Sequence, residues 1–117
     1  MLSALLLVNT KGDVLVSKYY RKEAKTNISD LFRINIISSQ NPLPITTIDN
    51  QTFYHLKHEN IYVVAVSSDN PNTCLVFEFL DKIIKLGTRY CHRFDELGIK
   101  NNFILIYELF DGSSRLN

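Results

Sequence analysis

The most constraining feature of this sequence is a surplus of apolar side chains in two segments near its end, residues 76–82 and 99–109. Each segment is apolar over more than one face, yet each also keeps charged or amide side chains at fixed places. A helix that only covers a sheet needs an apolar stripe about 100° wide. The surplus therefore predicts burial against a partner as well as against the chain's own sheet.

The first of these segments belongs to a longer helical pattern, which begins around Pro71 and runs to about Arg93. Pro is well tolerated in a first helical turn. At 100° per residue the apolar positions span an arc of about 200°. The excess over an ordinary surface helix predicts a second contact, either with the last helix or with another chain. The apolar positions are Leu75, Val76, Phe77, Phe79, Leu80, Ile83, Ile84, Leu86 and Tyr90.

The last segment, from Asn102 to Phe110, permits two interpretations. Its β-branched and aromatic residues favour a strand, whereas its nearly continuous apolar character is also typical of a helix buried almost all round. Periodicity does not separate the two. Gly112, followed by two serines, predicts the end of the element in either case.

The earlier part of the chain predicts strands. Residues 2–8 and 14–19 predict a hairpin around the turn at Asn9–Asp13, where Gly12 is free to take a positive φ. Alternating or β-branched patterns predict further strands at 45–49, 52–57 and 61–66, the last of them central.

A first helix is predicted between these strands. Asn27 is a suitable N-cap for a helix that runs to about Gln40, ahead of Pro42 and Pro44. Asn35 falls in the apolar stripe of this helix and is expected to be hydrogen-bonded at the edge of the core, with a role in a binding site as the alternative. The stripe itself consists of Ile28, Leu31, Phe32 and Ile36. Together these elements predict one α+β domain, with an antiparallel-leaning sheet and helices on both faces.

Composition narrows the class of protein. Length fits a single domain, and 13 basic against 12 acidic residues argue against nucleic acid as the main ligand, since phosphate binding needs a basic excess. On one helix, Cys74 and Cys91 would lie about 25 Å apart, too far for a disulfide, so free thiols are expected. The apolar start of the chain lacks a basic leader and is interpreted as a buried strand. No stretch approaches the length of a membrane span.

No pattern in the sequence predicts catalysis. Cys91 and His92 are neighbours and would point about 100° apart on a helix, while His55 and His58 would lie on opposite faces of a strand. The four glycines are isolated, so no phosphate-binding loop is present. We therefore expect a protein that is not an enzyme and that uses no cofactor or metal.

Two basic groups have alternative interpretations, as a contact for an acidic partner or anionic lipid, or as a solvated face. Nearby Glu23, Glu78 and Asp81 dilute the charge and favour a solvated face. The group on the long helix is the better candidate for a contact. The groups are Lys18, Arg21, Lys22 and Lys25, and Lys82, Lys85, Arg89, His92 and Arg93.

Several segments, in order and with similar spacing, resemble the N-terminal longin-type domain of clathrin-adaptor medium (mu) chains, most closely the endocytic, plasma-membrane type. The resemblance covers about residues 1–111 and leaves 112–117 as a tail or the start of a linker. It favours a helix for the ambiguous last segment. The matching segments are residues 5–17, 20–21, 31–37, 44–48, 53–57, 60–65, 76–82 and 99–109.

The resemblance implies a longin (SNARE-like) fold, a five-stranded sheet with one helix on one face and two on the other. It implies a non-catalytic assembly subunit that lies in the curved trunk of a large beta-type adaptin, among the other adaptor subunits. The resemblance implies that the protein is located in the cytoplasm, at the cytosolic face of the plasma membrane in clathrin-coated pits, and that it associates with the membrane through the complex. Medium chains read cargo tyrosine signals with a C-terminal domain that this chain lacks, so cargo binding is not expected. After Asp111 the sequence departs from the family pattern. A truncated chain, an artificial end and a divergent linker are three alternative explanations.

Two functions stay open, the assembly subunit and a free-standing longin module that binds a SNARE-like or regulatory helix. The second would use a groove between the first helix and an edge strand. Phe77, Phe79 and Phe103 are the aromatic residues whose apolar surface exceeds the need of the core. The candidate partner-binding residues are Phe32, Ile36, Ile45 and Ile48 in the groove, and Phe77, Phe79, Lys82, Lys85, Arg89 and Phe103 on the last helices.

Overall fold

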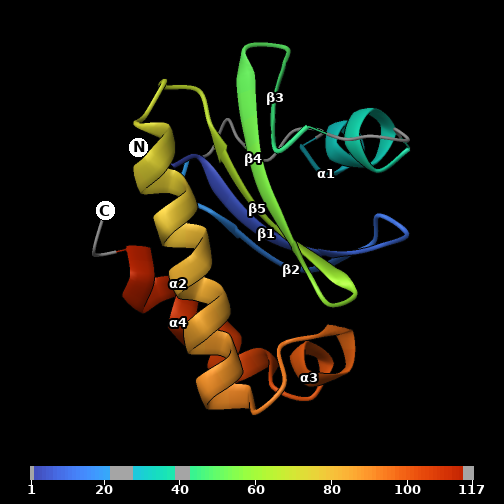
Figure 1. Ribbon diagram of the computed structural model, residues 1–117, viewed down its shortest axis with the longest axis vertical. Helices are drawn as coiled ribbons and strands as arrows, with labels where there is room; N and C mark the ends of the chain where they lie inside the picture. Colours follow the sequence, from blue (N-terminus) through green and yellow to red (C-terminus); the bar gives the residue numbers. More distant parts are fainter. Residues whose placement is uncertain (1, 22–27, 39–42, 115–117) are drawn as a thin grey trace.

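A single five-stranded sheet organises the chain (Figure 1). The computed structural model describes residues 2–21, 28–38 and 43–114. Every strand pairs antiparallel with its neighbours, in the order β2-β1-β5-β4-β3. The five predicted strands and the central place of β5 are confirmed. The strands are β1 (Ala4–Asn9), β2 (Val14–Tyr19), β3 (Ile45–Ile48), β4 (Gln51–His58) and β5 (Ile61–Ser67).

The predicted hairpin joins β1 to β2. Gly12 takes a φ of 97°, a left-handed conformation that costs glycine little. The Asn9 side-chain oxygen accepts hydrogen bonds from the backbone N–H groups of Lys11, at 3.0 Å, and Asp13, at 2.9 Å. The turn is thus held by a buried amide of β1 as well as by backbone pairing.

One face of the sheet is covered by α1 (Ile28–Phe32) and the π-helical turn η2 (Arg33–Ile37). Ile28, Phe32 and Ile36 recur every four residues and are fully or almost fully buried against the inward residues of β1, β4 and β5. The predicted apolar stripe is confirmed, but the α-helix is shorter than predicted, because it changes to π-helical geometry after Phe32. Asn27 and residues 39–42, which include the predicted helix end, lie outside the described residues. Asn35 bonds the Leu31 carbonyl oxygen at 3.0 Å but is exposed, so its predicted place at the core edge is wrong.

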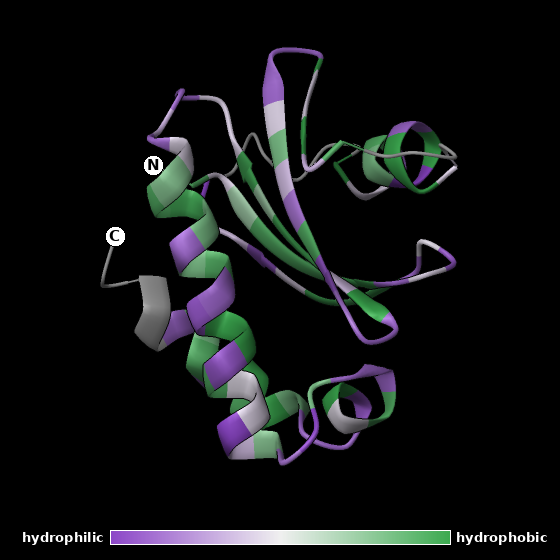
Figure 2. Cartoon of the chain, viewed as in Figure 1, coloured by the Kyte–Doolittle hydropathy of each residue, from purple (hydrophilic) through white to green (hydrophobic). Residues whose placement is uncertain are grey.

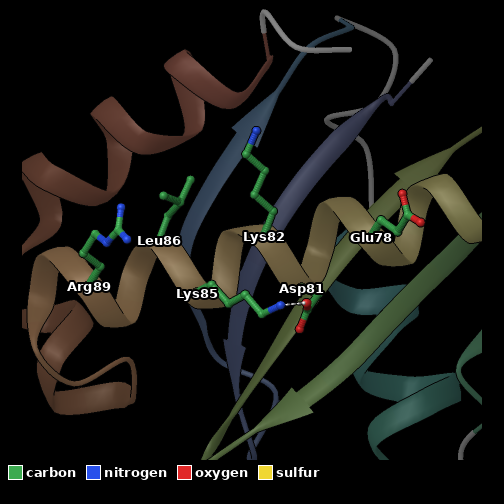
Figure 3. A pocket seen from close by; sticks show the side chains of 6 residues that line it. All are labelled: Glu78, Asp81, Lys82, Lys85, Leu86 and Arg89. Carbon is green, nitrogen blue, oxygen red and sulfur yellow. Dashed lines mark ion pairs between the residues drawn. The ribbon is translucent and has the colours of Figure 1, made fainter.

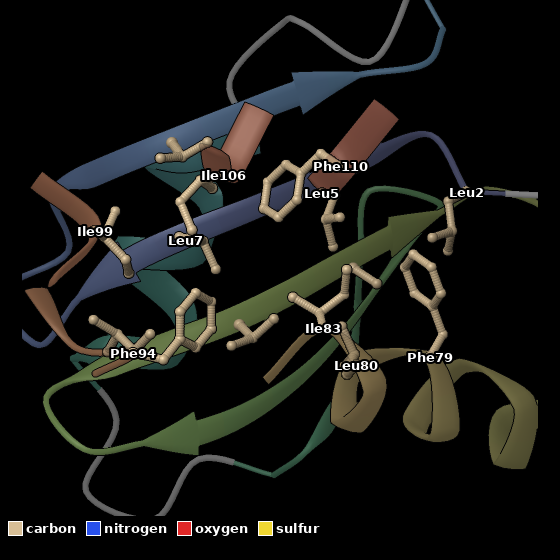
Figure 4. Packing of buried hydrophobic residues seen from close by; sticks show 14 of the residues in the cluster. Leu2, Leu5, Leu7, Phe79, Leu80, Ile83, Phe94, Ile99, Ile106 and Phe110 are labelled. Carbon is tan, nitrogen blue, oxygen red and sulfur yellow. The ribbon is translucent and has the colours of Figure 1, made fainter. Parts of the chain in front are cut away.

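The opposite face is covered by α2 (Thr73–Cys91), α3 (Glu96–Lys100) and α4 (Phe103–Ser114). Asn72 caps α2, since its side-chain oxygen accepts the Leu75 backbone N–H at 3.2 Å. The helix ends at Cys91, and the next residue, His92, takes a left-handed φ of 64°. Figure 4 shows the larger core cluster between these helices and the sheet, with buried side chains from β1, α2, α3 and α4.

The short helix α3 was not predicted, since the resemblance implied two helices on this face. Asp95 caps α3 by accepting the Gly98 backbone N–H at 2.8 Å. Two distant amides then fix its first residue: the Asn60 oxygen accepts the Glu96 backbone N–H at 2.9 Å, and the Asn9 amide donates to the Glu96 carboxylate at 3.1 Å. The helix therefore depends on tertiary hydrogen bonds that no local sequence pattern reveals.

The ambiguous last segment is the helix α4. Ile106 and Phe110, one turn apart, are fully buried against the sheet. The helix ends at Ser114, within the Gly-Ser-Ser stretch that predicted its end, so it continues past Gly112. A glycine near a helix end costs only about 1 kcal/mol relative to alanine, which does not outweigh the buried side chains before it.

Candidate interaction surface

The residues with possible catalytic chemistry are kept apart by the fold. His55 is buried between Phe32 and Tyr62, at ring-centre distances of 5.5 and 5.6 Å, whereas His58 packs near Phe94 on the opposite face of the sheet. Burial lowers the pKa of His55. Among the described residues, no three His, Cys, Asp or Glu side chains converge as metal ligands.

The two cysteines are both on α2 and are both free thiols, as predicted. Cys91 is buried, and this burial raises the pKa of its thiol, which disfavours the reactive thiolate. His92 follows it at the exposed end of the helix. The predicted separation of Cys91 from its neighbour His92 is confirmed.

The outer surface of α2 is basic and slightly hollowed. Lys82, Lys85 and Arg89 are exposed, and with Glu78, Asp81 and the half-buried Leu86 they line a groove of about 330 Å³ (Figure 3). The Lys85 ammonium lies 2.8 Å from the Asp81 carboxylate, one turn earlier. This hydrogen bond raises the pKa of Lys85. Lys82 and Arg89 make no ion pair with any described residue of the chain.

The outer surface of α4 is apolar instead. Its side chains at Phe103, Ile104, Leu105 and Tyr107 are between 40% and 77% exposed, with Ile104 the most exposed of the four. Figure 2 shows this helix, behind α2, largely in the colour of hydrophobic residues. Isolated exposed apolar residues are ordinary, but four within one and a half turns form the kind of surface that marks a protein contact.

One flank of α4 is fixed to the edge strand β2. The Lys18 ammonium lies 2.7 Å from the Asp111 carboxylate. Burial, with the Asp111 charge as a second cause, raises the pKa of the nearby Tyr20 to about 12. Since α4 also packs beside α2, the two outer surfaces belong to one continuous layer over the sheet. We call this layer, with the exposed side chains of α2 and α4, the α2/α4 face.

Three curated relatives match the chain over 95% of its length, and all three are named "AP-2 complex subunit mu". The identity is 42% over 112 residues for the protein of Dictyostelium discoideum, 38% over 113 for that of Caenorhabditis elegans and 38% over 112 for that of Schizosaccharomyces pombe. The chain is homologous to adaptor medium chains. The resemblance to the plasma-membrane type, stated from sequence segments, is thereby confirmed.

The chain matches only part of each relative, since it spans about a quarter of their length. No family model matches the chain. Among the described residues, no helix is long and apolar enough to cross a membrane. The medium-chain homology therefore comes from the relatives and agrees with the observed α+β fold.

The structure separates the predicted partner-binding residues of the first helix and β3. Phe32 and Ile36 are buried in the core beneath α1 and η2, where they have no free surface. Ile45, on the edge strand β3, is 38% exposed, and Ile48 on the same strand is partly buried against the core. Of the four residues predicted for this groove, only those on β3 have exposed surface, because Phe32 and Ile36 point into the core.

The predicted residues of the last helices also divide. Phe79 is buried, and Phe77 is half-buried with its ring 6.0 Å from that of Tyr54. Phe103 is 40% exposed. The three basic residues Lys82, Lys85 and Arg89 all lie on the exposed side of α2.

The sequence interpretation named Phe103 on α4 but not its exposed neighbours Ile104, Leu105 and Tyr107. A signal for them exists: Ile106, Leu109 and Phe110 share the arc that packs on the sheet. On a helix, the remaining apolar positions must then point elsewhere. They were missed because the segment had not been assigned to a helix from its residues alone.

Proposed function

We propose that the chain serves as a non-catalytic assembly domain in a clathrin-associated adaptor complex for endocytic protein transport. The carrying observation is its homology over 95% of its length to three AP-2 mu subunits. The α2/α4 face supports an assembly role, because it presents apolar side chains beyond what the core uses. In this role the chain would reach the cytosolic face of the plasma membrane in clathrin-coated pits through the complex.

The direct partner in this proposal is the trunk of a large beta-type adaptin, beside the other adaptor subunits. Two features of the described residues support a protein partner of this size. The exposed apolar residues of α4 are spread over more than one side of the helix, and the adjacent α2 adds unpaired cations for orientation. Interfaces of this kind combine an apolar centre with a polar rim.

The test is co-expression of the 117-residue chain with the trunk of an endocytic beta-type adaptin, followed by size-exclusion chromatography. The proposal predicts an equimolar complex. The Ile104→Asp variant should weaken it, since a carboxylate would be buried against apolar surface. Ile34→Asp is the matched control, because Ile34 is also an exposed isoleucine, 61% against 77%, but lies on η2 over the other face of the sheet.

Elution of the wild-type chain alone, soluble and monomeric, would contradict the proposal and favour the free-standing longin module. That alternative would bind its helix beside β3, the last strand of the sheet, where Ile45 is 38% exposed. It has less support, because Phe32 and Ile36 are used by the core.

A further inference from the structure

Three side chains of α2 form a row that the core does not use. Lys82, Leu86 and Arg89 follow one another at intervals of four and three residues, which places them on one side of a helix. Figure 3 shows them pointing the same way, on the side of α2 where α4 runs, while Asp81 and Lys85 point away and pair with each other. All five residues line the same groove.

The row is basic at both ends and apolar in the middle. Lys82 and Arg89 are exposed and have no carboxylate partner among the described residues, in contrast to Lys85. Leu86 between them is half-buried, so one side of it stays open. The row therefore offers two cations and one apolar contact in a line, beside the Lys85–Asp81 pair of the same groove.

The spacing of the row fits an α-helix. Lys82 and Arg89 are seven residues apart, which is about 10.5 Å along the axis. A partner helix with two acidic residues seven positions apart presents its carboxylates at the same interval. An apolar side chain between them would then meet Leu86, as in the packing of paired helices with flanking ion pairs.

We propose that this row is the seat of an acidic amphipathic helix from a partner protein. The proposal deepens the proposed function, on which it rests for the source of the helix, a large adaptor chain. A phosphate-rich partner fits less well, because the groove holds three cations against two carboxylates, Glu78 and Asp81. Nucleic acid and anionic membranes need a larger basic excess, whereas an acidic helix needs only the two cations at the ends of the row.

The first measurement is an NMR titration of the 117-residue chain with a stapled helical peptide that carries two glutamates about seven residues apart around a leucine pair. The proposal predicts amide shift changes that centre on Lys82, Leu86 and Arg89 and weaken as salt is added. A peptide with lysines in place of the glutamates should leave α2 unchanged. Equal binding of both peptides, or shift changes confined to other elements, would overturn the proposal.

The variant Lys82→Glu/Arg89→Glu should lower the affinity for the acidic peptide by about tenfold, because each attraction between a cation and a peptide glutamate becomes a repulsion between two carboxylates. The matched control is Lys11→Glu/Lys57→Glu, which makes the same change in net charge at two exposed lysines off α2. Circular dichroism would verify that both variants fold. An equal loss of binding in both double variants would show that only the net charge matters, and it would contradict the proposed binding site on α2.

The same variants with the adaptin trunk separate this proposal from the function. Loss of co-elution in Lys82→Glu/Arg89→Glu alone would support both. Unchanged co-elution would leave the assembly role standing and overturn the seat on α2 for that partner. Peptide binding without any trunk complex would support the seat and contradict the adaptin as its source.

Discussion

The two faces of the sheet are covered by helices, but in different ways. On one face, the short helical segment formed by α1 and η2 turns almost all its large apolar side chains toward the sheet, and Phe32 and Ile36 are buried. Over the other face, α4 has at least as many exposed apolar residues as buried ones among its described side chains. The difference indicates that core formation explains the first face, whereas the second also carries surface suited to another protein.

The largest expected effect should be equal on both faces. Phe32→Ala and Phe110→Ala each remove a fully buried ring, so each should lower the free energy of unfolding by about 3–5 kcal/mol. Urea denaturation of the two variants measures this. If Phe110→Ala cost less than about 1 kcal/mol, far below the usual cost of a buried ring, α4 would be a loosely attached element, and the comparison between two complete layers would fail.

A smaller effect is expected at the amide that ties the hairpin to α3. Asn9→Ala removes two acceptor bonds to backbone N–H groups and the bond to Glu96, with a loss of about 1–3 kcal/mol. Asn60→Ala, which removes one exposed bond to the Glu96 backbone, should cost about 1 kcal/mol or less. The same denaturation assay ranks the two, and a larger loss for Asn60→Ala would refute the role given to Asn9.

The free energy of unfolding should depend on pH through His55, which is buried beneath the first helix. Its buried imidazole has a pKa below the ordinary 6.5, so the unfolded chain binds a proton before the folded chain does. Stability is therefore full above about pH 6.5 and falls as the pH drops below it. Asp95 and Glu96, whose carboxyl pKa values are lowered by their hydrogen bonds, lose stabilisation only at more acid pH.

The control for this prediction is His55→Phe, which keeps an aromatic ring beside Phe32 and Tyr62 but cannot titrate. Its free energy of unfolding should be flat between about pH 7 and 5.5, where that of the wild type declines. Identical slopes for the two proteins would show that His55 is not the titrating group.

The smallest effect is expected for the exposed isoleucines. Ile104→Asp and Ile34→Asp should each change the unfolding free energy of the isolated chain by about 0.5 kcal/mol or less, because neither side chain is buried. A loss above about 2 kcal/mol for Ile104→Asp, a size typical of buried positions, would show that this residue belongs to the core and would remove it from the α2/α4 face.

The strands, the hairpin and α2 could be predicted because their patterns are local. Residues 61–66 are apolar and largely β-branched, and Asn72 gives α2 a side-chain cap. The remainder depends on distant contacts. The first turn of α3 is fixed by Asn9 and Asn60, which lie far from it in sequence.

The candidate surface was predicted in part for the same physical reason. The basic residues of α2 follow from helical periodicity, which fixes the exposed side once the apolar side is known. Burial of Phe32 and Ile36 could not be separated from partner binding, because both require an apolar residue. The pairing of Lys85 with Asp81, rather than of Lys82 or Arg89 with a described carboxylate, depends on side-chain directions that the sequence does not specify.

The most direct test of the account is hydrogen–deuterium exchange of the chain, alone and with the trunk of an endocytic beta-type adaptin. The account predicts added protection of backbone amides in α2 and α4, with exchange in α1 and β3 unchanged. Added protection confined to α1 and β3 would contradict it, because the binding surface would then lie on the face that the core already explains.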